Sequence, residues 1–433
     1  MMAETDFHLS FYLICLVLSW IALRGILYGR AIFQFPTVAA MLGLAWIVPQ
    51  GFELESNPNN LLGSEAFWLY ATFCFVCIFF GFKRGCRTQL RRIRMASDNG
   101  LPFYNMSRLT IAAAGLTVIG HVSLLMMGGV ETSGMGGQWT GVITLYALLY
   151  KANGLGLCLS VLIFAHTGSR IALVIALVAA QPLFVSATIG IRREQIFDLI
   201  ILTLGGWYIA KGLFPSRIMM IGAVLIGSVV LNSTANLRTY VASGQGNLIT
   251  ALLSEEIYQE FQYVNLEQDR VTEIGQAQYD FRYMNETWRW ELGADYWNQL
   301  VHRYVPAFLV GRSIKDGLKI DTLAERFRRG ETEGLFSLGS TRTGFADSYR
   351  NFGVFGVLVF GLIGYIFGRL YSKATVGSIS GQYFYLALLA EGLKGITHST
   401  SEFFSALPFV FVISLIIFHY AQKSPSADIS FQN

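Results

Sequence analysis

The sequence from Gly339 to Gly353 concentrates polar side chains directly before an apolar stretch. Its Gly, Ser and Thr residues predict a turn that enters a helix, and the free backbone N–H groups of a helix start suit phosphate oxygens. Arg342 can bind two such oxygens with its forked guanidinium group. Asp347 and Arg350 are three residues apart, so they share a face if the helix has begun. We interpret this segment as an anion-binding site; an ordinary capped helix start with an Asp–Arg surface pair is the alternative.

A titratable pair lies near the C-terminus. His398 and Glu402 are four residues apart, beside Lys394. A His or Glu side chain at a cleft facing the membrane surface can act as a general base. A pair in an interfacial loop explains the same residues, and the sequence leaves both interpretations open.

Aromatic and charged side chains alternate between Asn285 and Tyr304, where Trp288 and Trp290 are followed by His302 and Arg303. Aromatic rings can pack against the C–H faces of sugars while charged groups bind the hydroxyls. The segment therefore suits sugar binding, although aromatic residues at the membrane surface give the same pattern.

The composition restricts which class of protein can contain these residues. The chain has 433 residues, of which 53% are hydrophobic and only 14% charged, whereas soluble domains carry about 25% charged residues. A soluble enzyme and a nucleic-acid-binding protein are therefore excluded as interpretations. Residues 232–350 carry 29 of the 60 charges, so we predict a low-charge membrane body with one soluble-like insert.

Apolar stretches of about 20 residues predict membrane-spanning helices. We expect an all-α polytopic membrane protein with about eleven spans (ten to twelve), and we divide the chain into three parts. Residues 1–232 form an N-terminal bundle of about eight spans, residues 233–343 a large and mainly helical extracytoplasmic loop, and residues 344–433 a bundle of about three spans. The expected spans are 9–29, 31–50, 64–83, 107–129, 140–165, 170–190, 195–211, 217–232, 344–371, 382–398 and 403–421.

The orientation follows from the excess of Lys and Arg in cytoplasmic loops. The basic run from Lys83 to Arg94 is expected to be cytoplasmic, which places the N-terminus and the long insert outside. Arg192 and Arg193 then lie at the outer end of a span, and Lys151 and Lys394 also lie toward that side. Such outward cations are consistent with a phosphorylated ligand at the outer leaflet. Snorkelling, or for the Arg pair a contact with Glu194, is the alternative.

Two motifs in this arrangement resemble those of the Wzy-type O-antigen and exopolysaccharide repeat-unit polymerases. The stretch Tyr304-Val-Pro306-Ala-Phe-Leu is similar to an Ile-Pro-Arg-Phe-Leu-like segment of that family, with Ala307 in place of its Arg. The stretch from Asp347-Ser-Tyr349-Arg350 to Gly356 is similar to the family's acidic-x-Tyr-x-x-Phe-Gly-x-x-Gly entry to a span. The single long outer loop between late spans also fits.

The resemblance implies a metal-independent glycosyltransferase of the GT-C type in the bacterial inner membrane. Its donor and acceptor would be glycans on undecaprenyl pyrophosphate, polymerised at the outer face without a cofactor. A chain-length regulator and export machinery would be further partners, besides the lipid bilayer. The residues assigned to these roles are Asp347, His398 and Glu402 as candidate bases, with His302 ranked last; Arg192, Arg193, Arg342 and Arg303 for the pyrophosphate; and Arg350, Tyr349, His302, Trp288 and Trp290 for the substrate.

Other functions fit the same architecture. An O-antigen ligase differs only in its acceptor, the lipid A core. A lipid-linked sugar flippase or another transporter would favour charged residues inside the spans and two similar halves. A sensor or a purely structural membrane protein needs none of the chemistry above.

Overall fold

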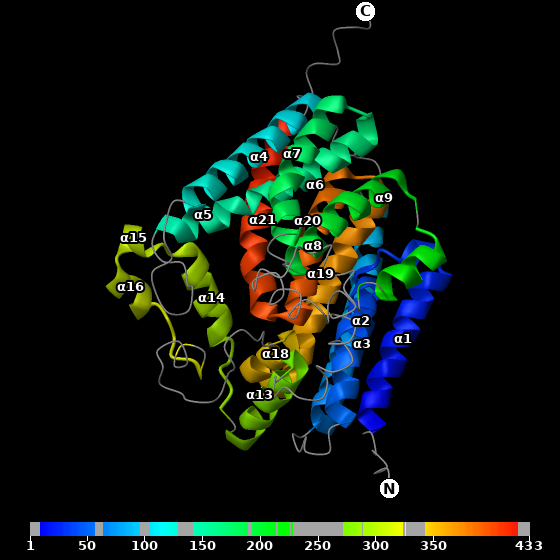
Figure 1. Ribbon diagram of the computed structural model, residues 1–433, viewed down its shortest axis with the longest axis vertical. Coiled ribbons are helices and arrows are strands. Elements are labelled where there is room, and N and C mark those ends of the chain that lie inside the picture. Colours follow the sequence, from blue (N-terminus) through cyan, green and yellow to red (C-terminus); the bar gives the residue numbers. More distant parts are fainter. Residues whose placement is uncertain are drawn as a thin grey trace, which may run out of the picture.

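The computed structural model describes residues 9–56, 64–95, 104–128, 142–188, 193–213, 215–225, 227, 272–287, 289–323, 325 and 343–422. Within these ranges the chain forms helices and no β-strand (Figure 1). Eight of the helices are long and apolar enough to cross a membrane. The expected class of a helical multi-pass membrane protein is confirmed at this level.

The first group of helices contains α1 (Leu9–Leu27), α2 (Phe35–Ser56) and α3 (Ser64–Met95), joined in sequence by short segments. The late helix α19 (Val357–Thr375) packs along α3. Pairs such as Gly81 with Gly361 and Gly85 with Tyr365 advance in the same direction, so the two helices are parallel. Their basic ends consequently lie on one side of the bundle, where Arg369 contacts Gln89, as the charge pattern of cytoplasmic loops requires.

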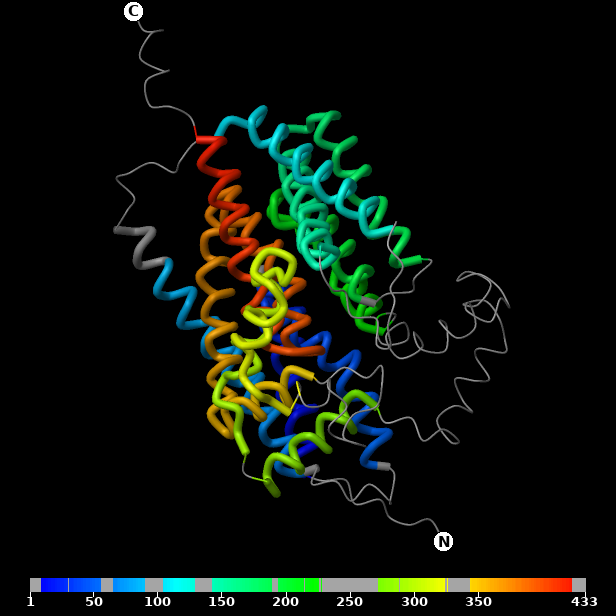
Figure 2. The backbone as a smooth tube through the Cα atoms, turned by 90° about the vertical axis from the view of Figure 1, so that its left-hand side faces the viewer, coloured from blue at the N-terminus to red at the C-terminus, as the bar shows by residue number. Residues whose placement is uncertain are grey.

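A second group contains α4 (Met106–Gly128), α5 (Val142–Tyr150), α6 (Ala152–Thr167) and α7 (Arg170–Thr188). Figure 2 shows these cyan-to-green helices beside the orange and red helices of the C-terminal part. The helix expected at 140–165 is interrupted at Lys151, which ends α5 and precedes α6. The chain continues through α8 (Arg193–Ile200), the π-helix η2 (Ile201–Gly205) and α9 (Gly206–Lys211).

The helices α20 (Ile379–Thr397) and α21 (Thr400–Ala421) join the two groups. Sixteen of the nineteen residues of α20 are buried, because it contacts α6, α19, α21 and α2. A helix that is surrounded by other helices needs no continuous lipid-facing surface, so it can carry Glu391 and Lys394. These side chains therefore lie inside the protein.

The described part of the expected outer loop is helical, and its residues 272–287 and 289–323 are called the outer segment below. It contains α13 (Glu273–Thr287), α14 (Ala294–Tyr304), α15 (Ala307–Val310) and α16 (Arg312–Gly317), and α18 (Gly344–Phe352) with the 3-10 helix η3 (Gly353–Gly356) leads into α19. α13 contacts the C-terminal half of α2, where Trp46 donates to Glu273. This segment thus covers the end of the bundle opposite the basic end of α3 (Figure 1).

Three of the eleven expected spans are not among the eight candidate spans. The stretch 195–211 is helical but divided among α8, η2 and α9, and 382–398 corresponds to the buried, charge-bearing α20. The expected span at 217–232 extends beyond the described residues.

The packing of α3 on α19 leads to the first prediction. A Cβ atom on Gly364 would meet the backbone of Ile78, and one on Gly368 would meet that of Phe82. Glycine here permits the close backbone approach that holds membrane helices together. Gly364→Leu is expected to lower the thermal unfolding temperature in detergent, because overpacking costs about 1–3 kcal/mol or more. Gly115→Leu is the matched control, since nothing lies near a Cβ at this glycine of α4; equal effects of the two changes would contradict the prediction.

Candidate functional site

Lys394 is the centre of an ionic cluster between α20 and α8, in which the side chains of Lys394 and Glu391 are 10% and 11% exposed and that of Glu194 is 40% exposed. Its Nζ atom lies 2.5 Å from Glu194 Oε1, 3.6 Å from Asp198 Oδ2 and 3.5 Å from Glu391 Oε1. Glu194 and Asp198 are one turn apart on α8, and Glu391 is one turn before Lys394 on α20, so each helix presents its charges on one face. The two helices are thus connected by a single ammonium group that contacts three carboxylates.

Lys151 adds a second cation from the junction of α5 and α6. Its Nζ atom lies 3.1 Å from Glu391 Oε1, the same oxygen that Lys394 contacts. The break in the helix places this side chain toward α20, where it is 34% exposed. Glu391 is therefore held by two lysines through one of its oxygens.

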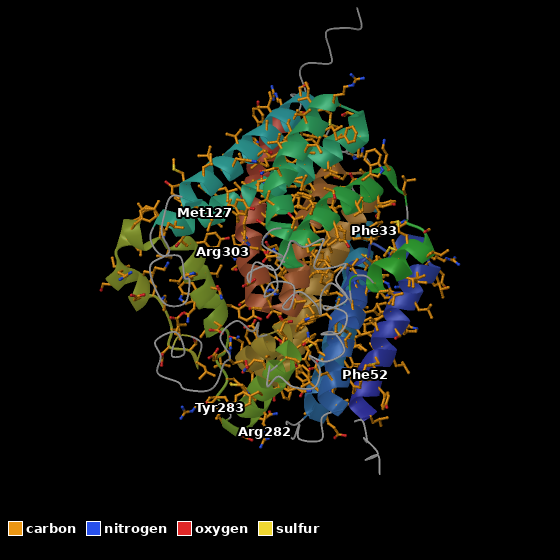
Figure 3. The ribbon with its side chains drawn as sticks, viewed as in Figure 1. Phe33, Phe52, Met127, Arg282, Tyr283 and Arg303 are labelled. Carbon is orange, nitrogen blue, oxygen red and sulfur yellow. The ribbon has the colours of Figure 1, made fainter. Side chains whose placement is uncertain are left out.

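A cavity of about 250 Å³ adjoins this cluster. Three cations and three carboxylates are among its lining residues, namely Lys151, Arg303, Lys394, Glu194, Asp198 and Glu391. Arg303 reaches it from α14 and Met127 from the end of α4, and Figure 3 labels both. The cavity is thus formed jointly by the membrane helices and the outer segment.

Polar atoms without a hydrogen-bond partner are concentrated around this cavity. Within the described residues, five buried atoms of its lining have none, and they come from the four helices α6, α8, α14 and α20: Asn153 Oδ1, Gln195 Oε1, Asp198 Oδ1, Arg303 Nη1 and Glu391 Oε2. Buried polar groups in proteins are nearly always hydrogen-bonded. A cavity of this size, lined by residues with several unpartnered polar atoms, is therefore suited to a polar ligand or to water.

A smaller cavity of about 50 Å³ shares Glu194, Asp198, Ala390 and Lys394 with the large one. Its further lining includes Trp46, Glu273 and His398. Trp46 Nε1 donates to Glu273 Oε2 at 2.6 Å, and His398 Nδ1 lies 2.7 Å from Thr397 Oγ1. The charged cluster around Lys394 consequently borders two cavities.

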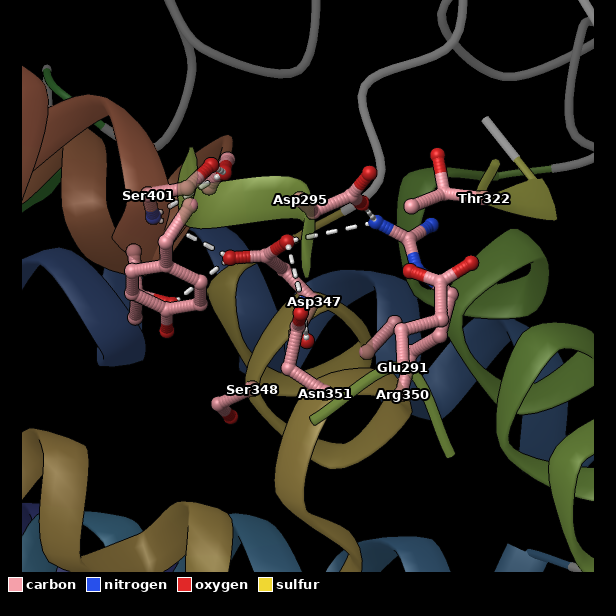
Figure 4. A network of polar contacts seen from close by, with 12 residues as sticks. Glu291, Asp295, Thr322, Asp347, Ser348, Arg350, Asn351 and Ser401 are labelled. Carbon is pink, nitrogen blue, oxygen red and sulfur yellow. Dashed lines mark hydrogen bonds and ion pairs between the residues drawn. The ribbon is translucent and has the colours of Figure 1, made fainter. Parts of the chain in front are cut away.

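A second polar centre surrounds Arg350 on α18 (Figure 4). The guanidinium group contacts Glu291 Oε2 at 3.0 Å, Asp347 Oδ1 at 3.3 Å and Asp295 Oδ2. Arg350 and Asp347 are each 3% exposed, and Asp295 and Glu291 are about as deeply buried. One arginine thus holds the outer segment, through Glu291 and Asp295, on the membrane helices.

Asp347 uses both carboxylate oxygens within the protein. Thr400 Oγ1 and the backbone N–H of Ser401 donate to Oδ2 at 2.7 and 3.1 Å, and Arg350 donates to Oδ1. Thr400 in turn accepts a hydrogen bond from Tyr296 of α14 at 2.5 Å. Burial, together with the negative charge of Asp347, raises the pKa of Tyr296 well above its usual value, so this phenol remains a donor. Asp347 therefore connects α18, α21 and α14.

Tyr349 packs into the same region. Its ring stacks on Phe281 of α13 with centroids 3.7 Å apart, and its hydroxyl donates to Asn285. The neighbouring Ser348 hydroxyl lies 2.9 Å from that of Tyr70 on α3. Both contacts join the outer segment and α18 to the bundle.

The structure distributes the predicted site residues among several places. Arg303 lines the large cavity and His398 the small one, whereas Asp347, Tyr349 and Arg350 lie in the network around Arg350. Glu402 is half-buried in the first turn of α21 and lines neither cavity. The carbonyl oxygen of His302 accepts a hydrogen bond from Lys315, and Trp290 packs against Gly353. Arg192, Arg342 and Trp288 lie outside the described residues, and Arg193 begins α8 but its side chain is not among the described ones.

The sequence analysis missed Asp198 and Glu391, and it considered Glu194 only as a partner of the Arg pair. Both residues lie inside apolar stretches of the sequence, and an acidic residue in such a stretch requires a partner. This position was the signal that could have identified them. Glu391 precedes Lys394 by three residues within such a stretch, which predicts a shared face. No local pattern indicates the contact of Lys394 with α8.

Within the described residues, no group of three or more His, Cys, Asp or Glu side chains has an arrangement that could hold a metal ion. No family model, curated protein or solved structure matches this chain.

Proposed function

We propose that this protein polymerises undecaprenyl-pyrophosphate-linked oligosaccharide repeat units, as an eleven-span enzyme at the outer face of the bacterial inner membrane. The proposal combines the family resemblance with one observation. Five unpartnered polar atoms surround a cavity that is lined by Arg303, Lys151 and Lys394. The phosphate oxygens of a lipid-linked glycan would bind these cations, and its sugar hydroxyls would donate hydrogen bonds to the free amide oxygens of Asn153 and Gln195.

Arg303 is the cation best placed for the departing pyrophosphate. Within the described residues it has no ion-pair partner, and its Nη1 atom is buried at the cavity without a hydrogen bond. Lys394 and Lys151, in contrast, already contact carboxylates. A guanidinium group can bind two phosphate oxygens at once, so Arg303 supports the leaving group and Lys151, which is partly exposed, assists it.

The network around Arg350 supports this site from a distance. Asp295 and Arg303 lie eight residues apart on α14, and Asp295 is bound to Arg350. Tyr304 of α14 also donates to the backbone of Ser405 on α21 at 2.6 Å. Because these contacts fix both ends of α14, Asp347 and Arg350 act in the proposal as positioning residues for Arg303.

Arg303→Gln is expected to reduce glycosyl transfer about 100- to 1,000-fold, the usual cost of removing one group that stabilises developing charge. The assay supplies purified protein in detergent with lipid-linked repeat units and follows the ladder of longer products. Arg282→Gln is the control, since Arg282 is 47% exposed on α13 and pairs with Glu286 at 2.7 Å. Equal ladders from wild type and Arg303→Gln would contradict the assignment. Loss of the ladder in EDTA would contradict metal independence.

A ligase is separated from a polymerase by the acceptor. If lipid A core is added and receives the glycan while no ladder forms, the protein is a ligase. If radiolabelled repeat units bound to the protein yield no transfer to either acceptor, both enzymatic functions fail.

Transport of the lipid-linked glycan is the second candidate. The observation that favours it is the cluster of two lysines and three carboxylates between the helices, since ionisable groups within membrane segments mark transport pathways and proton relays. Movement of the substrate across liposomes that contain the protein, without any ladder, would establish this candidate and overturn the polymerase.

A further inference from the structure

We infer that Asp198 is the general base that accepts the proton of the acceptor hydroxyl. The inference rests on the proposed glycosyl transfer and names a residue for its chemical step. Asp198 lines both the large and the small cavity. Its Oδ1 atom is buried and has no hydrogen-bond partner within the described residues. A base must combine these properties, because its free oxygen has to face the group that it deprotonates.

The contacts of the neighbouring carboxylates distinguish Asp198 from them. Lys394 lies 3.6 Å from Asp198 Oδ2 but 2.5 Å from Glu194, and Glu391 Oε1 contacts two lysines at 3.1 and 3.5 Å. Nearby cations stabilise the ionised form of a carboxylate and weaken it as a base. Asp198 has the longest single cationic contact of the three, so it is the strongest base in the cluster.

The backbone next to Asp198 is unusual as well. The π-helix Ile201–Gly205 begins three residues after Asp198, and Thr203 Oγ1 donates to the carbonyl oxygen of Leu199 at 2.5 Å. π-Helical turns are rare, and many of them occur at functional sites. The irregular turn follows directly on the part of α8 that borders the cavities.

The proposed step balances as follows. The acceptor hydroxyl oxygen forms a bond to the anomeric carbon of the donor glycan, while its proton moves to Asp198 Oδ1. The bond between the anomeric carbon and the pyrophosphate oxygen breaks, and its electron pair leaves with undecaprenyl pyrophosphate. Arg303 and Lys151 stabilise the charge on the leaving group, and Asp198 later releases its proton to water.

The charged groups around Asp198 determine how its proton affinity responds to pH. The charged and titratable residues that line the two cavities are Glu194 on α8, Glu391 and Lys394 on α20, Lys151 between α5 and α6, Arg303 on α14, Glu273 on α13 and His398 at the end of α20. The pH profile must therefore be assigned to Asp198 by substitution of this residue and of its neighbours.

The test measures kcat, the KM for the donor and the pH profile of ladder formation. Asp198→Asn is expected to lower kcat about 100- to 10,000-fold, the contribution of general base catalysis, while the KM for the lipid-linked donor stays unchanged. The decline of the wild-type rate toward acidic pH should disappear from the residual activity. Glu194→Gln, one turn away on α8, is the matched control. This variant is expected to change the rate through its contact with Lys394, while the rate still declines toward acidic pH as in the wild type.

Wild-type kcat and an unchanged pH profile in Asp198→Asn would overturn the inference while leaving the proposed function intact. An inactive wild-type protein would overturn both. If Asp198→Asn is not monodisperse in detergent, Asp198→Glu decides: retention of part of the activity with a shifted acidic decline supports the base, and an unshifted decline refutes it.

Discussion

Replacing Arg350 with leucine is expected to lower the free energy of unfolding by about 3–5 kcal/mol, the cost of leaving buried charges without their partner. The guanidinium group is 3% exposed and contacts Glu291, Asp295 and Asp347. Without it, three carboxylates remain in a region shielded from water. The outer segment should then separate from α18, because Glu291 and Asp295 belong to that segment.

Thermal unfolding in detergent, followed by fluorescence-detected size exclusion, measures this loss. Arg282→Leu is the control, since Arg282 and Glu286 form an exposed pair on α13; such pairs contribute about 0–1 kcal/mol. Limited proteolysis should also cut the outer segment of Arg350→Leu sooner than that of the control. If both variants unfold at the wild-type temperature, Arg350 does not hold the segment.

Replacing Lys394 with methionine is expected to lower both the stability of the protein and its rate of glycosyl transfer. The change removes the ammonium group that, among the residues the structure describes, alone contacts Glu194, Asp198 and Glu391 together. The expected loss of stability is smaller than the cost of breaking a fully buried pair, about 3–5 kcal/mol, because Asp198 and Glu391 are largely buried but the Glu194 side chain is 40% exposed and can be solvated. Glycosyl transfer should be lost as well, because α8 and α20 form the wall between the two cavities.

A matched set of variants separates charge from packing at this position. Lys373→Met removes an exposed lysine from the end of α19 and should change little. Adding Glu194→Gln to Lys394→Met should recover part of the stability, because it removes one of the unpaired carboxylates. No recovery in the double variant would show that Lys394 acts through packing of its side chain instead.

The two charged centres are connected through α14. Asp295 near its start binds Arg350, and Arg303 near its end reaches the large cavity. Variants at Arg350 should therefore displace Arg303, which lowers kcat and raises the KM for the donor. Asp198→Asn should lower kcat alone. The KM and kcat measurements thus distinguish positioning from chemistry.

Several features could be predicted from the sequence because they depend on local patterns. Apolar stretches of sufficient length located the eight candidate spans. Lys151, Asn153 and Gly154 interrupt the apolar stretch 140–165, and the break between α5 and α6 lies there. Gly361, Gly364 and Gly368 have the spacing of closely packed membrane helices, and they lie against α3. The excess of Lys and Arg in cytoplasmic loops places the run from Lys83 to Arg94 and the basic residues Arg369 and Lys373 on one side, and the parallel packing of α3 and α19 agrees with this.

The composition of the site depended on the tertiary structure. Asp347 and Arg350 were expected to bind substrate or act in catalysis, but Arg350 contacts Glu291 and Asp295, which lie 59 and 55 residues away. Lys151 contacts Glu391, which is 240 residues away. A hydropathy or charge pattern specifies the length of a helix and the face that carries its charges, because these repeat every few residues. It contains no information on which face of another helix will lie opposite, and that juxtaposition decides whether a buried charge is paired, solvated or free to react.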